Sequence, residues 1–387
     1  MPATQNRPDE RLKKSPASNE LCLRILDQTA IDSLAIARWQ DLAHRSCHQN
    51  PFLLPDFVLP AWKYLTPEQK HVLVVVESSD DQRWLAAGGF CLGQTTADFP
   101  MPHALASTNL YTFRTGLLLD TEFASDALDT FLDGITEGGW RFQGVEFSGL
   151  RVDSILARAL IASTERLGFD WHTTHQRMVP AVFPDIITEE YLARHWSKSR
   201  RKSIRRSRNR LEAHGPVELR LSRQPEDVAR ALESFLKLEH ASWKGQEGTA
   251  CKSRPQDEAF VREAIMGLAQ HGNVVISELT AGDRIAAAAI NLTAGTALYA
   301  FKIGWDIEFA EASPGVVHET ELLLESQNRL NEFTIFDSCA TETSYIAPLW
   351  PERIPVATGV ICASRLSRWS QRLLNAGRKA KLAVSWW

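Results

Sequence analysis

The stretch LYAFKIGWDIEFAEASPGVVHETELLL, residues Leu298 to Leu324, indicates how the chain folds. Its first residues, Leu298 to Gly304, alternate apolar and polar side chains and are rich in aromatics, which predicts a strand. Ser313-Pro314-Gly315 then predicts a helix start, because serine caps a backbone N–H, proline suits the first position, and glycine lets another group approach. Free N–H groups at such a start suit a phosphate or pyrophosphate, although an ordinary capped helix has the same pattern.

A second copy of this pattern occurs earlier in the chain. Residues 110–116 read LYTFRTG, against LYAFKIG at residues 298–304, and we predict a strand at both places. The flanking segments correspond in order and approximate spacing: HVLVVVES (71–78) with NVVISELT (273–280), RWLAAGGFCL (83–92) with RIAAAAINL (284–292), and GVEFS (144–148) with TIFDS (334–338). The chain is therefore interpreted as a tandem duplication. The first copy has Asp120-Thr121-Glu122 in place of Ser-Pro-Gly, and carboxylates repel a phosphate, so we expect the second copy to be the working one.

Length and composition are those of a globular protein with room for two ordinary domains. The chain has 387 residues, of which 44% are hydrophobic and 23% charged, and its net charge of −4 gives no global attraction to nucleic acid or anionic membrane. Its six cysteines are scattered without a Cys-x-x-Cys pair, which argues against a disulfide framework or a zinc site and suits a reducing cytoplasm. The longest apolar runs have the length of strands, so no membrane span is expected.

The chain divides into five parts. We predict a disordered leader (1–20), a structural first copy (21–187), a basic connecting helix (188–214), a second copy with the ligand site (215–363) and a basic amphipathic tail helix (364–387). Strands and helices alternate in both copies, which predicts an α/β or α+β mixed sheet with helices on its faces.

The connecting helix contains the most charged segment of the chain. Eight of the thirteen residues from Lys198 to Arg210 are Lys or Arg. On a helix they surround a narrow stripe of apolar and small residues, namely Leu192, Trp196, Ser199, Ser203, Ser207 and Leu211. The segment is interpreted as a solvated face, a nucleic-acid contact, or an electropositive wall for an anionic ligand. Because no aromatic residue within it can stack on bases, we favour the wall over nucleic acid.

The tail is also amphipathic. Leu366, Trp369, Leu373 and Leu374 share one face, and the other faces carry basic residues: Arg365, Arg368, Arg372, Arg378, Lys379 and Lys381. Such a helix either contacts an anionic membrane surface or docks on its own domain, and docking is the interpretation we prefer.

Several motifs of the second copy, taken in order, resemble those of the CelD-like acyltransferases. These belong to the GNAT superfamily and are associated by name with cellulose and exopolysaccharide synthesis. The motifs, within about residues 239–353, are Trp243-Lys244-Gly245, Gly248-Thr249-Ala250, FKIGWD from Phe301, Ser313-Pro314-Gly315, Asp337-Ser338-Cys339-Ala340, Leu349-Trp350 and Arg353. Two copies joined by a basic helical segment also resemble the FemAB peptidyltransferases. The resemblance implies a tandem duplicated GNAT fold.

The resemblance further implies acyl transfer from a thioester, acyl-coenzyme A, to an amine or hydroxyl of a small-molecule or glycan-linked acceptor, without a metal. GNAT folds splay two neighbouring strands, and the donor lies in the gap with its pyrophosphate at the following helix. Carried onto this chain, Phe301, Lys302 and Ile303 line the donor strand, and the N–H groups after Ser313, including those of Gly315 and Val316, hold the pyrophosphate. We expect charge reversal at Lys302 to weaken donor binding and charge reversal at Arg114 to leave it unchanged.

Acyl transfer needs a base for the nucleophile and an acid for the leaving thiolate. Asp337, at a predicted strand end, is our first candidate for the base, and Glu239 and His240 are alternatives that would otherwise form a surface pair. Tyr345 is the candidate acid, unless it belongs to the core. A covalent route through Cys339 is the alternative to direct transfer.

Three function classes remain for this sequence. The first is an acyl-CoA-dependent acyltransferase, with Trp243, Lys244, Trp350 and Arg353 in substrate binding. The second is a FemAB-like transferase that draws aminoacyl groups from tRNA through the basic segment. The third is a non-catalytic partner of an exopolysaccharide complex. The retained Ser-Pro-Gly start and Asp337 favour the first over the third, and the net charge favours it over the second.

Overall fold

The computed structural model describes residues 21–136 and 142–384, which form two similar halves of alternating strands and helices. The first half contains β1 (Leu21–Asp27), α1 (Ser33–Arg45), α2 (Pro55–Tyr64), β2 (His71–Ser78), β3 (Trp84–Gln94), β4 (His103–Ala106), β5 (Leu118–Leu119), α3 (Ala124–Thr136), β6 (Gly144–Arg151), α4 (Ile155–Leu167) and β7 (Asp170–Val182). The predicted leader at residues 1–20 lies outside the described residues.

The second half begins with two helices that connect it to the first. It contains α5 (Glu189–His195), α6 (Lys198–Glu212), β8 (Val217–Ser222), α7 (Pro225–Ala241), α8 (Trp243–Gln246), α9 (Pro255–Gln270), β9 (Val274–Ala281), β10 (Arg284–Ala294), β11 (Ala297–Trp305), α10 (Pro314–Leu324), α11 (Ser326–Arg329), β12 (Ile335–Asp337), β13 (Glu352–Cys362) and α12 (Arg365–Val384). The predicted α/β fold with a mixed sheet is confirmed.

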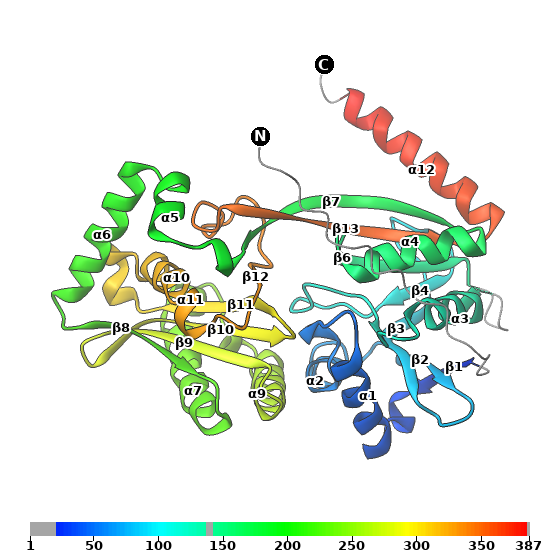
Figure 1. The fold of residues 1–387 in the computed structure, drawn as a ribbon, viewed down its shortest axis with the longest axis horizontal. Coiled ribbons are helices and arrows are strands. Elements are labelled where there is room, and N and C mark those ends of the chain that lie inside the picture. Colours follow the sequence, from blue (N-terminus) through cyan, green and yellow to red (C-terminus); the bar gives the residue numbers. More distant parts are fainter. Residues whose placement is uncertain (1–20, 137–141, 385–387) are drawn as a thin grey trace.

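The strands form one continuous sheet, in which the two halves exchange their last strands. Its order is β1-β2-β3-β4-β6-β13-β7-β12-β11-β10-β9-β8, with β5 paired to β3. The last strand of the chain, β13, pairs with β6 of the first half, while β7 of the first half pairs with β12 of the second. β7 and β13 also pair with each other along their length, and Figure 1 shows them crossing the top of both lobes. Each half therefore completes its sheet with a strand from the other.

Helices cover both faces of the sheet in each half (Figure 1). In the second half, α7 and α9 bury Phe235 and Phe260 on one face, and α10 packs on the other face beside Leu298. In the first half, α3 buries Phe131 on one face, and α1 buries Trp39 on the other. Apolar residues that recur every three or four positions give each helix one such buried face.

Local sequence signals set the ends of several helices. The Asp32 carboxylate accepts a hydrogen bond from the Ala35 N–H (2.8 Å) at the start of α1, and the Ser154 hydroxyl accepts one from the Ala157 N–H (3.1 Å) at the start of α4. Gly168 ends α4 with a φ of 67°, a conformation that glycine adopts without steric cost.

The predicted strand at residues 110–116 is wrong. Residues 107–117 contain no strand, and the first-half strand that occupies the place of β11 is β4, between β3 and β6. The LYTFRTG side chains instead reach the second half: the Tyr111 hydroxyl donates to Asp257 (2.8 Å), and the Arg114 guanidinium donates to Asp337 (2.7 and 3.0 Å). The alternation of aromatic and polar residues here serves contact between the halves and not strand pairing.

The exchanged strand β13 needs a glycine at position 359. A Cβ at Gly359 would lie 2.2 Å from the ring of Trp171 on β7, which is too close for any real contact. We therefore expect Gly359→Ala to lower the free energy of unfolding by about 1–3 kcal/mol, measured by urea denaturation. In a Trp171→Ala background the same substitution should cost much less. Equal costs in both backgrounds would contradict this account of the strand contact.

Candidate active site

Strands β11 and β12 form a fork in the second half. They pair in parallel only from Ala297↔Ile335 to Tyr299↔Asp337, after which β12 ends and β11 continues to Trp305. On its other edge, β11 pairs with β10 but carries a bulge at Phe301. A bulge re-aims the side chains beside it. Beyond Tyr299, β11 has no strand partner on the β12 side, so the backbone groups on that edge are not used in a strand ladder.

Helix α10 begins beside the open end of the fork. Gly315, in its first turn, is buried, and a Cβ there would lie 3.6 Å from Trp305 and 3.7 Å from Ile303. The predicted serine cap is wrong: Ser313 has a φ of 47°, and its hydroxyl makes no capping hydrogen bond. The left-handed backbone at Ser313 turns the chain sharply into the helix, so the first N–H groups of α10 receive no side-chain cap from this residue.

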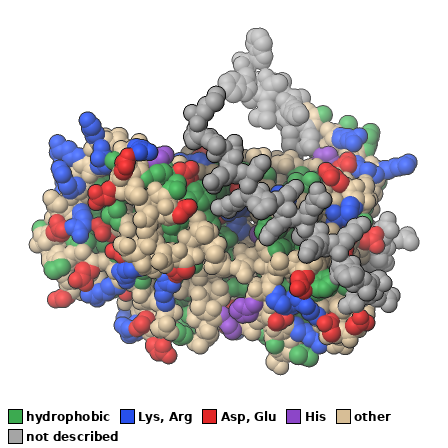
Figure 2. Space-filling model, viewed as in Figure 1, with side chains coloured by type: hydrophobic (Ala, Val, Ile, Leu, Met, Phe, Trp, Pro, Cys, Tyr) green, Lys and Arg blue, Asp and Glu red, His purple; other side chains and the backbone are tan. Residues whose placement is uncertain are grey.

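The basic connecting segment packs against α10. The structure divides it into α5 and α6, and the Ser197 hydroxyl caps α6 by accepting from the Arg200 N–H (3.2 Å). Arg208 of α6 donates to Glu321 of α10 (2.9 Å). Of the predicted stripe, Leu192, Trp196, Ser207 and Leu211 are buried, whereas Ser199 and Ser203 are exposed because they border a groove. Figure 2 shows the cations of this segment gathered at the upper left.

That groove lies between α6 and the first turn of α10. It has a volume of about 450 Å³, and it is lined by Ser197, Ser199, Arg200, Ser203, Ile204, Val316, Tyr345, Pro348 and Leu349. Arg200 is half-buried, whereas its neighbours Arg201 and Lys202 are exposed. The start of α6, the first turn of α10 and one guanidinium therefore converge on the same groove, which is an arrangement suited to an anion.

Two lysines share one buried carboxylate on the opposite face of β11. Glu239 of α7 is fully buried, and its Oε2 accepts from the Cys251 N–H (2.9 Å). Its Oε1 lies 3.3 Å from Lys244 Nζ and 4.0 Å from Lys302 Nζ. Gly304 makes this approach possible, because a Cβ there would lie 3.1 Å from the Glu239 Cβ. The alternative that Glu239 forms a surface pair with its neighbour is therefore wrong.

Lys244 also contacts β11 directly, since its Nζ donates to the Ile303 carbonyl. Burial lowers the pKa of Lys244, the Glu239 carboxylate offsets part of this shift, and Lys302 adds to it. His240, the neighbour of Glu239, is exposed on the outer side of α7. Of the residues predicted at this place, the structure brings Glu239, Lys244, Lys302 and Ile303 together, and it leaves His240 outside the cluster.

Segment 110–116 packs against the same cluster. The Lys302 Nζ lies 4.7 Å from the centre of the Tyr111 ring, and Phe113 packs against Phe301 with ring centres 5.9 Å apart. Asp257 accepts a hydrogen bond from the Tyr111 hydroxyl, which fixes the ring over the lysine. Tyr111 was not predicted as part of this site, because the first copy was expected to be structural.

Asp337, the first candidate for the base, is held in a buried ion pair. Its two oxygens accept from Arg114, and its Oδ1 also accepts from the Cys339 N–H (2.8 Å). Both side chains are almost completely buried. Burial and the neighbouring Asp337 carboxylate raise the pKa of the Cys339 thiol, so the thiol stays protonated at neutral pH and is a poor nucleophile. Arg114 is therefore a structural partner of the second half and not a neutral control.

Tyr345 lies at the groove and contacts α10. Its hydroxyl is 3.5 Å from Glu319 Oε1, and burial of that hydroxyl together with the Glu319 carboxylate raises the pKa of Tyr345. Glu319 in turn lies 3.6 Å from Nδ1 of the buried His318, whose Nε2 contacts the Ser277 hydroxyl (2.8 Å). Glu319 and His318 were not among the predicted site residues. Glu319 follows Val316 by three residues on α10, and residues at this spacing lie next to each other on a helix. The sequence spacing could therefore have placed Glu319 near the groove.

The remaining predicted substrate-binding residues are spread out. Trp350 is fully buried and packs against Phe336, so it is a core residue. The Arg353 guanidinium donates to the carbonyls of Ala347, Trp350 and Glu352, which holds the chain before β13. Trp243, at the start of α8, is 41% exposed and therefore accessible to a ligand.

A large cavity lies between the two halves, below the paired part of the fork. Its volume is about 490 Å³, and Tyr299 and Asp337, the last rung of the fork, line one side. Hydroxyl and amide side chains make up much of the wall: Ser46, Gln49, Asn50, Thr115, Ser154, Thr296 and Thr334. Arg151 and Arg158 line it near the start of α4. His48 also faces it, and burial, reinforced by Arg151, lowers the pKa of His48 to about 4, so this ring is neutral at pH 7.

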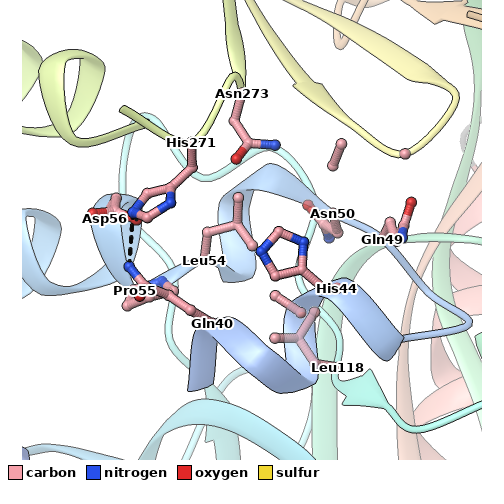
Figure 3. A pocket seen from close by; sticks show the side chains of 13 residues that line it. Gln40, His44, Gln49, Asn50, Leu54, Pro55, Asp56, Leu118, His271 and Asn273 are labelled. Carbon is pink, nitrogen blue, oxygen red and sulfur yellow. Dashed lines mark hydrogen bonds and ion pairs between the residues drawn. The ribbon is translucent and has the colours of Figure 1, made fainter. Parts of the chain in front are cut away.

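A smaller pocket lies where α1 and α2 meet the turn before β9 (Figure 3). His271 reaches across this junction to Gln40 (2.9 Å) and lies 3.7 Å from the Asp56 carboxylate. The pocket volume is only about 60 Å³, which holds a few water molecules and not a substrate. We interpret it as a hydrated contact between the halves.

Within residues 21–136 and 142–384, no group of three or more His, Cys, Asp or Glu side chains could hold a metal ion. In the same part of the chain, no helix is both long and apolar enough to cross a membrane.

Comparison with known proteins supports a GNAT fold. Residues 198–345 match the family described as an acetyltransferase (GNAT) domain. FemX resembles the chain at a TM-score of 0.54 and 10% identity, over 87% of this chain and 98% of that one. The C-terminal domain of a putative lysylphosphatidylglycerol synthetase from Agrobacterium fabrum resembles the chain at a TM-score of 0.51 and 10% identity. The match covers 88% of this chain and 95% of that one. A conserved protein of unknown function from Bacteroides thetaiotaomicron resembles the chain at a TM-score of 0.50 and 12% identity, over 85% of this chain and 97% of that one. The comparison with curated proteins found no match. The predicted GNAT fold is confirmed.

The buried ion pair between Arg114 and Asp337 should contribute to the stability of the protein. Removing one partner leaves an uncompensated buried charge, so we expect Arg114→Met alone to lower the free energy of unfolding by about 3–5 kcal/mol. The double variant Arg114→Met with Asp337→Leu should cost clearly less than the sum of the two single variants. Urea denaturation of all four proteins measures the coupling, and purely additive losses would contradict the pairing.

Proposed function

We propose that this protein is an acyltransferase that moves an acyl group from acyl-coenzyme A to an amine or hydroxyl acceptor. The observation that carries the proposal is the fork: β11 loses its partner beyond Tyr299, and the first turn of α10 lies beside the open end. An extended donor placed along this edge has its thioester near the end of β12 and its phosphates near α10. The match of residues 198–345 to the acetyltransferase domain covers both elements.

The anionic part of the donor is assigned to the groove between α6 and α10. The Gly315 N–H, in the first turn of α10, provides a hydrogen bond at the positive helix end, whereas the Val316 N–H already donates to the Ser313 carbonyl (3.0 Å). Arg200 provides a guanidinium that lines the same groove. In this proposal the basic segment acts as an electropositive wall, with Arg200 as its contact residue and the exposed cations as a longer-range field.

The chemistry requires one proton to leave the acceptor and one to reach the sulfur. The acceptor nucleophile attacks the thioester carbonyl, the C–S bond breaks, and the thiolate takes up a proton. Tyr345 lines the groove to which the phosphates are assigned, and its raised pKa keeps the phenol protonated, so we assign it a hydrogen bond to that end of the donor. Glu239 is buried on the opposite face of β11, and we assign it the role of holding Lys244 and Lys302 in place. The proton of the acceptor then leaves to solvent, and the thiolate takes its proton from solvent. Asp337, bonded on both oxygens to Arg114, is assigned a positioning role.

The acceptor is assigned to the cavity between the halves. Its wall of hydroxyl and amide side chains suits a ligand with many hydroxyl groups, such as a sugar. This lining supports the acceptor class that the CelD-like resemblance implies, a precursor of a polysaccharide or of the envelope. Tyr299 and Asp337 connect the cavity to the fork, so acceptor and thioester would meet at the last paired rung.

Calorimetric titration with acetyl-CoA tests the donor site. Gly315→Asp should weaken binding by roughly 1–3 kcal/mol, because it adds negative charge and blocks backbone N–H groups. Arg200→Gln should weaken it by about 1 kcal/mol or more, through loss of a charged hydrogen-bond donor. Arg201→Gln, which removes an exposed neighbouring charge outside the groove, is the matched control. Unchanged affinity in both test variants, with the fold intact, would refute the donor assignment.

A second candidate function is transfer of an aminoacyl group from tRNA. The observation that favours it is the exposed cationic face of α6, formed by Arg201, Lys202, Arg205 and Arg206. If this face grips RNA, the logarithm of affinity should fall with the logarithm of salt by about 0.7 per neutralised phosphate of a single strand. Replacing Arg201, Arg205 and Arg206 by Gln should then flatten the slope. Weak tRNA binding with no effect of these substitutions favours acyl-CoA.

A further inference from the structure

The first turns of α12 carry their apolar side chains on the outside. Leu366, Trp369 and Leu373 are 61%, 63% and 54% exposed, and their spacing of three and four residues places them on one face of the helix. The face turned toward the protein is polar, because Ser367 and Gln371 are fully buried. The start of the tail helix docks on the protein as expected, but through this polar face and not through its apolar row.

Polar contacts hold α12 in this orientation. The Gln371 amide donates to the Asp98 carbonyl, and the Arg368 guanidinium donates to the Gly168 carbonyl (2.9 Å). The Ser364 hydroxyl accepts from the Ser367 N–H (3.0 Å) at the start of the helix. The orientation follows from hydrogen bonding and not from burial of the apolar row.

Cationic side chains border the exposed apolar row. Arg365 is exposed, and Arg372 is 71% exposed even though it lies 3.4 Å from Asp170. On a helical projection these two arginines fall on one flank of the row formed by Leu366, Trp369 and Leu373. Figure 2 shows basic and apolar side chains next to one another at the upper right, where α12 begins. Figure 1 shows the helix continuing away from the body of the protein.

We propose that this face of α12 binds the surface of an anionic lipid membrane. An interfacial helix inserts aliphatic and tryptophan side chains at the headgroup boundary, and adjacent arginines pair with lipid phosphates. Trp369 lies in the centre of the apolar row, where an indole ring suits the boundary between headgroups and acyl chains. A second copy of this chain fits the face less well, because the arginines that flank the row would repel each other across such a contact. The protein lies on the membrane in this proposal and does not span it.

Co-sedimentation of the full-length chain with vesicles tests the proposal. We expect binding to vesicles of phosphatidylglycerol and phosphatidylcholine, and little binding to phosphatidylcholine alone. Trp369→Ser with Leu373→Ser should abolish it, and Arg365→Gln with Arg372→Gln should weaken it on the order of 30-fold at low salt, taking the usual contribution of each cation near an anionic surface. All four side chains are exposed, so the melting temperature should stay unchanged.

Matched controls carry equally exposed side chains elsewhere. Leu110→Ser removes an apolar side chain that is 70% exposed, and Arg201→Gln with Arg205→Gln removes two exposed cations of α6. Both controls should bind anionic vesicles as the parent does. Failure of the parent to bind, or equal losses in the controls, would overturn the proposal. So would a parent dimer in sedimentation velocity that Trp369→Ser converts to monomer, with no vesicle binding, since a second copy would then be the occupant.

Discussion

Pairing between β7 and β13 at the centre of the sheet is the constraint on which both halves depend. Strand β12, one arm of the fork, is only three residues long, from Ile335 to Asp337, and it is held between β11 and β7. A strand this short has few hydrogen bonds of its own, so its position depends on the neighbour that the first half supplies. The open edge of β11, to which we assign the donor, is thus defined by a strand from the first half.

Contacts beyond the sheet repeat this dependence. Arg114 reaches Asp337, and Tyr111 covers Lys302, so side chains of the first half contact both strands of the fork. At the corresponding position in the first half, Asp120 is buried between Arg45 and Arg83. The two halves therefore differ here: one has the start of α10, and the other has a buried, paired carboxylate.

Local sequence was sufficient for most helices and strands, but not for the contacts between the halves. Helices such as α4 follow from caps and apolar periodicity, which act within a few residues. Strand exchange joins residues nearly two hundred positions apart, and no local pattern encodes it. LYTFRTG has the alternation of a strand, yet Arg114 is used for a buried ion pair whose partner is distant in sequence. At the site, Phe301 and Ile303 lie on a strand and Gly315 lies at a helix start, as the local pattern predicts. The burial of Glu239 and Trp350 needed tertiary structure, because it depends on what packs over them.

Strand exchange also determines when this protein can fold during its synthesis. The ribosome releases β6 and β7 long before it releases β13, which begins at Glu352 and must enter between them. Until then both strands present unpaired edges, and such edges associate readily with other chains. Contacts of such long sequence separation also slow folding. The nascent first half therefore needs protection, by a chaperone or by its own non-native pairing of β6 with β7, from the release of β7 at Val182 until β13 has emerged at Cys362.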